Sequence, residues 1–155
     1  MYAKPIYVFR LEEEDRIVRY PPESSYYAIS LIAMPAPGAG GILCFHPLQT
    51  PQTGEAPAMP ATGFSCLFNA AKLSHHLQRS LPLLPMFKKD GIPVYWLLPG
   101  LHANLHALFE KMLMELNNNY AFKYELLANY LSQIIHQALK LQPEMHRLPT
   151  DGCQF

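Results

Sequence analysis

Three polar side chains recur at helical spacing in the second half of the chain and could hold a metal ion. His102, His106 and Glu110 lie four residues apart, which places them on one face of a helix. Two imidazoles at this spacing can bind a transition metal through their ring nitrogens. Metalloproteases carry a glutamate directly after the first histidine, whereas Ala103 stands there in this chain. We therefore expect a solvated histidine face and assign no metal ligand.

Two further groupings of histidine suggest other chemistry. His75 and His76 directly follow Ser74 and could act as a general base beside a serine nucleophile, but no nucleophile elbow surrounds the serine. Cys44 and His46 alternate along one expected strand and could share a metal, but no second pair of ligands lies nearby, so a buried thiol and a histidine at a loop entry are the expected roles. Since the sequence contains neither paired catalytic carboxylates nor a glycine-rich phosphate loop, we expect no enzymatic activity and no cofactor.

The aromatic side chains suggest either a β core or the lining of a small-molecule pocket. Those that fall on expected strands are Tyr26, Tyr27, Phe45, Phe64, Phe68, Tyr95 and Trp96. His136 lies in an apolar helical stretch, where a core or interface histidine is expected and a pH sensor is the alternative. The sequence assigns no ligand and no ligand-binding residue.

Composition limits the class of protein to which the chain can belong. Its 155 residues, half of them hydrophobic, suffice for one domain with a sizeable core. Twelve basic and twelve acidic side chains cancel, so the segment offers no cationic field for nucleic acid or a membrane surface. The three cysteines form no CxxC pair, and no export signal or apolar membrane span is apparent. We expect a cytoplasmic protein with reduced thiols.

The first two thirds of the chain have a strand-like pattern. Alternating apolar and β-branched residues predict strands over 6–9, 16–20, 26–32, 42–45, 64–68 and 92–98. Six prolines and five glycines between Pro35 and Gly63 exclude a long helix there. A short helix is expected from Asn69, as its N-cap, to about Arg79.

After Gly100 the period changes from two to about 3.5, which predicts two helices. The first covers 101–116 and ends at three successive asparagines; the second covers about 120–142 and ends at Pro143. The second helix carries an apolar seam that consists of Tyr124, Leu127, Leu131, Ile134, Ala138 and Leu141. Either the β part and the first helix cover this broad seam, or it forms a homodimer interface with a second subunit. We assign it as the dimer interface.

Several stretches resemble the N-terminal domain of AraC-type bacterial transcription regulators. They are GFSCLFN at 63–69, LLPMF at 83–87, GIPVY at 91–95, LFEKM at 108–112, YAFKYELL at 120–127, NY at 129–130 and IIHQALK at 134–140. The stretch from 108 to 140 is the most specific. The similarity covers roughly Tyr20 to His146 and is closest after Gly63.

The resemblance implies an α+β domain in which a small antiparallel cupin-like β barrel or half-barrel precedes a two-helix antiparallel hairpin. On this basis residues 1–147 form an effector-sensing and dimerising domain, with a β body over about 1–99 and the hairpin over about 101–142. The tail 148–155 does not resemble the family's linker, and the chain has no helix-turn-helix domain, so DNA would be contacted only through an attached one.

Two departures from the family pattern affect the expected function. Only the six residues 35–40 separate Met34 from the stretch that begins at Gly41, whereas the family carries another strand or hairpin there. A barrel without this strand pair would have an open or collapsed pocket. The histidine cluster of metal-binding cupins is also missing. The alternative function is a free-standing cupin-like protein that binds a small molecule or acts as an enzyme.

Overall fold

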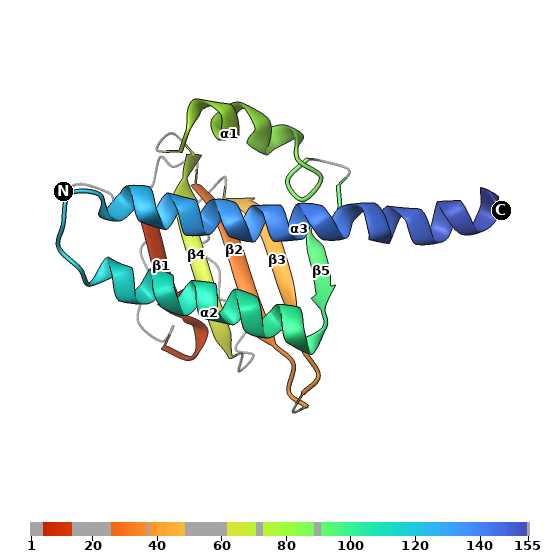
Figure 1. The fold of residues 1–155 in the computed structure, drawn as a ribbon, viewed down its shortest axis with the longest axis horizontal. Coiled ribbons are helices and arrows are strands. Elements are labelled where there is room, and N and C mark those ends of the chain that lie inside the picture. The colour runs from red at the N-terminus through yellow and green to blue at the C-terminus, as the bar shows by residue number, and fades with distance from the viewer. Residues whose placement is uncertain are drawn as a thin grey trace.

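The chain folds as an α+β domain in which helices cover one face of an antiparallel sheet. The computed structural model describes residues 5–13, 26–36, 38–48, 62–70, 73–88 and 91–154. Within these ranges it contains one five-stranded sheet and three α-helices. Helices α2 and α3 both lie across the same face of the sheet (Figure 1). Among the described residues, no helix is long and apolar enough to span a membrane.

All five strands of the sheet correspond to stretches expected from the alternation of apolar residues. They are β1 (Ile6–Arg10), β2 (Tyr26–Ala33), β3 (Gly41–Leu48), β4 (Gly63–Asn69) and β5 (Val94–Leu97). The sixth expected strand, 16–20, lies outside the described residues. The spatial order is β1-β4-β2-β3-β5 with every neighbouring pair antiparallel, so β1 and β5 are the edge strands. The described strands therefore form an open sheet that does not close into a barrel.

Because side chains alternate along each strand, the sheet has two distinct faces. Val8, Ile29 and Phe45 belong to the main buried cluster, which also contains residues of α2 and α3. On the opposite face, Ala28 and Leu67 form a smaller cluster with Tyr7 and Phe9 packed against it. The principal core thus lies between the sheet and the two long helices.

Helix α1 (His75–Ser80) is shorter than expected and begins later. The expected cap, Asn69, is instead the last residue of β4 and pairs with Tyr26. Ser74 caps the helix, because its Oγ accepts a hydrogen bond of 3.3 Å from the backbone N–H of Leu77. The extended pairing of Asn69 prevents it from serving as a cap. Short 3-10 helices follow β1 and α1 at Leu11–Glu13 and Leu81–Leu83.

The two long helices are α2 (Pro99–Leu116) and α3 (Lys123–Gln154). The break between them falls at Asn117, as expected, and α3 begins three residues later than expected. The expected end at Pro143 is wrong, because α3 runs through this proline to Gln154. A proline removes one N–H from the helical ladder, but helical turns on both sides can carry the helix past it. The C-terminal part of α3 extends beyond β5 (Figure 1).

Candidate functional site

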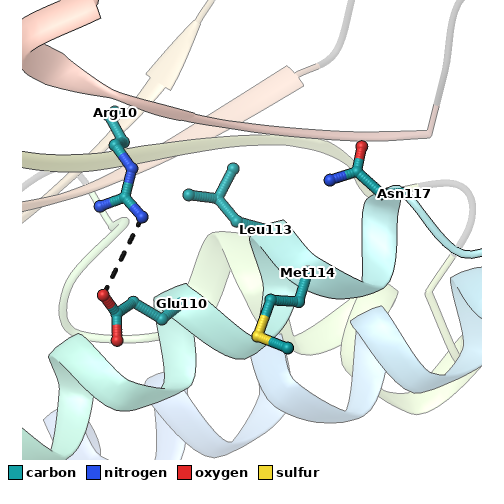
Figure 2. A pocket seen from close by; sticks show the side chains of 5 residues that line it. All are labelled: Arg10, Glu110, Leu113, Met114 and Asn117. Atoms are coloured by element: carbon teal, nitrogen blue, oxygen red, sulfur yellow. Dashed lines mark ion pairs between the residues drawn. The ribbon is translucent and has the colours of Figure 1, made fainter.

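A pocket of about 410 Å³ lies where the edge strand β1 meets the C-terminal half of α2. It is lined by Arg10 from β1 and by Glu110, Leu113, Met114 and Asn117 from α2 (Figure 2). This volume is within the range of small-molecule sites in proteins. The lining combines one cation, one anion, one amide and two apolar side chains, so it suits a small ligand with both polar and apolar parts.

The local structure explains why these side chains meet. Arg10 ends β1 on the same side as Ile6 and Val8, because residues two apart face the same side of a strand. Its side chain therefore projects toward α2 rather than away from it. Glu110, Leu113 and Asn117 recur at steps of three and four along α2, so they line one helix face.

Opposite charges face each other across the pocket. An Arg10 guanidinium nitrogen, Nη2, lies 3.9 Å from Oε2 of Glu110 (Figure 2). The side chains are 37% and 47% exposed, and at this distance the pair is too long to be a direct hydrogen bond. Solvent screens such a pair, so it adds little to stability and can open to accept a ligand.

Each of the two charged side chains makes one further contact. The Arg10 guanidinium lies over the ring of Phe64, 5.1 Å from its centroid, which is a cation–π geometry. On the other side, Nδ1 of His106 lies 3.8 Å from Oε1 of Glu110, and its ring meets that of Phe64 edge to face. Phe64 is fully buried, so its ring provides a fixed surface for the Arg10 guanidinium and the His106 ring.

The helical spacing of His102, His106 and Glu110 does bring them onto one face of α2. The rings of the two histidines have centroids 6.2 Å apart, and His106 contacts Glu110. Within the described ranges, no three histidine, cysteine or acidic side chains are arranged to hold a metal ion. Burial, and secondarily the charge of His106, lowers the pKa of His102 below its ordinary value. Glu110 contributes to the pocket with Arg10 instead.

The other groupings are separated or have structural roles. Ser74 caps α1, and His75 and His76 are exposed on its first turn. Cys44 is partly buried on β3, and burial raises the pKa of its thiol. The side chain of His46 lies outside the described residues. His136, expected in a core or interface, is exposed on the outer side of α3.

The aromatic side chains on the strands mostly form the core. Phe45, Phe64, Phe68 and Tyr95 are at most 1% exposed, and Tyr27 stacks on Phe68 from a partly buried position. Burial raises the pKa of Tyr95 to about 12. Trp96 differs because it is 64% exposed on β5. The side chain of Tyr26 is not among those described.

The apolar seam of α3 packs largely against the sheet of its own chain. Leu127, Leu131, Ile134 and Ala138 are fully buried in the main core, and Tyr124 and Leu141 are partly buried beside it. The outward side of this part of the helix is polar and consists of Glu125, Asn129, Gln133, His136 and Lys140. A second copy approaching the folded chain would therefore meet polar side chains of α3 rather than the seam.

The sequence placed His106 and Glu110 on one polar helix face but indicated neither the pocket nor Arg10, the partner of Glu110. Arg10 follows an expected strand and precedes an acidic run, which gives no sign that it faces a helix a hundred residues later. The only available signal was its place two residues after the apolar Val8 on one strand face. Comparison of the chain with known protein-family models and with curated protein sequences finds no match.

Proposed function

We propose that the chain is the effector-sensing and dimerising domain of an AraC-type transcription regulator that acts in the cytoplasm through an attached helix-turn-helix part. The stretches that resemble this family fall on β4, on the entry to β5, and on α2 and α3. In this proposal the open sheet is a cupin-like half-barrel, and α2 and α3 are the helical pair that follows it. The order of strands and helices agrees with such a domain.

One observation carries the sensing role: the pocket joins the sheet to the end of α2 that leads into α3. Its lining comes from β1 and from the last two turns of α2, ending at Asn117, the C-cap residue. A ligand there would contact both layers of the fold. If it binds better to one position of α2 relative to β1, it shifts the population toward that position.

Buried contacts offer a route by which such a shift reaches α3. Phe109 and Met112 of α2 belong to the same core as Leu127 and Leu131 of α3. Close-packed side chains move together rather than independently, so a displacement of α2 changes how α3 sits on the sheet. A homodimer would use the α3 surface that remains outside the core, and the attached DNA-binding part would be repositioned with it.

A fusion experiment tests this role. The chain is joined to the helix-turn-helix half of an AraC-type regulator, and operator binding is measured by fluorescence anisotropy beside that half alone. Dimerisation through the chain should tighten binding to a two-site operator at least about tenfold, because the second contact becomes intramolecular. Operator binding equal to that of the isolated half, together with a monomeric mass at high concentration, would overturn the proposal.

A further inference from the structure

The charges in the pocket between β1 and α2 restrict the ligand that it can accept. Arg10 and Glu110 bring one positive and one negative charge into the pocket from facing sides, with Nη2 and Oε2 3.9 Å apart (Figure 2). A simple anion would be attracted by Arg10 and repelled by Glu110. A simple cation would be attracted by Glu110 and repelled by Arg10. A ligand with adjacent opposite charges gains from both residues.

The remaining lining is apolar on one side. Leu113 and Met114 follow Glu110 along α2, and Met114 is 69% exposed. Methionine is flexible and polarisable, so it adapts to apolar groups of different shapes. An apolar chain attached next to the charged groups would lie along these two side chains and remove their surface from water.

We propose, on the basis of the sensor role above, that this pocket binds a free α-amino acid with an apolar side chain. Its carboxylate pairs with the Arg10 guanidinium, whose planar fork matches a carboxylate, and its ammonium pairs with Glu110. Its side chain covers Leu113 and Met114. Phe64 holds the guanidinium from below, so Arg10 presents its donors to the pocket without a large change of position.

Binding is measured by calorimetry with L-norleucine and with two analogues that each lack one charge, hexanoate and pentylamine. Norleucine should bind at least about tenfold more tightly than either analogue, since each charge-assisted hydrogen bond contributes about that factor. Arg10→Met and Glu110→Gln should each weaken norleucine binding at least about tenfold. Lys111→Met, which removes an exposed cation that follows Glu110 in the sequence and does not line the pocket, should leave norleucine binding unchanged.

A nuclear magnetic resonance measurement on the unmodified chain keeps the test independent of whether the variants fold. The methyl signal of Met114 should shift when norleucine is added and should not shift with either analogue at the same concentration. Hexanoate or pentylamine binding as tightly as norleucine would overturn the proposal. The proposal would also be overturned if no binding were detected at norleucine concentrations several-fold above about 1 mM.

The outcomes separate the ligand class from the sensor role. If apolar amino acids fail to bind but the fusion protein still dimerises on its operator, the ligand class is wrong and the proposed function stands. If norleucine binds at Met114 but the fusion protein binds its operator no better than the isolated half, the ligand class stands and the regulatory role is wrong.

Discussion

The side chain of His102, in the first turn of α2, packs directly on the backbone of Gly41 at the start of β3. A Cβ atom at position 41 would overlap the imidazole of His102 and would lie 2.6 Å from the carbonyl oxygen of Ile32. The absence of a side chain at Gly41 is therefore what allows the beginning of α2 to sit against the sheet.

Gly41→Ala is expected to destabilise the fold by roughly 1–3 kcal/mol, the usual cost of inserting a methyl group into packed surroundings. Urea unfolding of the variant and the parent chain measures this difference. Gly100→Ala is the matched control, because a Cβ there meets nothing within 4 Å. Alanine within the helix should leave stability unchanged or raise it by up to about 1 kcal/mol. Equal stability of Gly41→Ala and the parent chain would contradict the described contact.

Leu131→Glu is expected to lower the free energy of unfolding by at least about 3 kcal/mol, because it places a charge in the core. Gln133→Glu, two residues later on the exposed side, should change stability by less than about 0.5 kcal/mol. It should instead weaken a dimer formed through the outer side of α3 about tenfold, as measured by analytical ultracentrifugation. A Leu131→Glu chain that is fully stable but monomeric would show that the seam faces another subunit.

Stability should decrease as the pH falls below about 6.5, in part because of His102. Its pKa is lower in the folded chain than in the unfolded one, so protonation favours unfolding between the ordinary pKa and the lowered one. The melting temperature of His102→Gln should therefore decrease less than that of the parent chain when the pH falls from about 7.5 to about 5.5. An identical pH dependence of the parent chain and of His102→Gln would contradict this role of His102.

Cys66 is expected to resist alkylation until the chain unfolds. Its side chain is fully buried on β4, and burial raises the pKa of its thiol, so almost no thiolate is present in the folded state. Cys44 is only partly buried and should react earlier, which mass spectrometry of digested samples can follow. Labelling of Cys66 in native buffer at the rate of an exposed thiol would show that β4 is accessible to solvent.

The alternation of apolar residues was sufficient to predict all five described strands, since each has one face in the main core. The change of period after Gly100 likewise predicted α2 and the start of α3 to within three residues. Strand order was not predictable in this way, because the pairing of β1 with β4 rather than with its sequence neighbour leaves no local pattern. The pocket depends on how β1 and α2 are placed on the sheet, which explains why the sequence put Glu110 on a polar helix face but did not pair it with Arg10.

Two of the expectations that differ from the structure concern helix ends. Asn69 and Ser74 are both good N-caps, and the pairing of Asn69 with Tyr26 in the sheet decides between them. Proline often follows the end of a helix, yet α3 continues past Pro143. In both cases the local sequence allows two helix boundaries: Asn69 or Ser74 at the start of α1, and Pro143 or a later residue at the end of α3. The local sequence alone does not decide between them.

The position of β1 at the sheet edge has a consequence for the newly synthesised chain. Arg10 is made before β4, and among the described strands only β4 pairs with β1. Glu110 follows later still, on α2. The pocket therefore cannot form cotranslationally until most of the chain has emerged. A ligand that bridges the two residues would bind only to molecules in which β1, β4 and α2 have all been made and have come together.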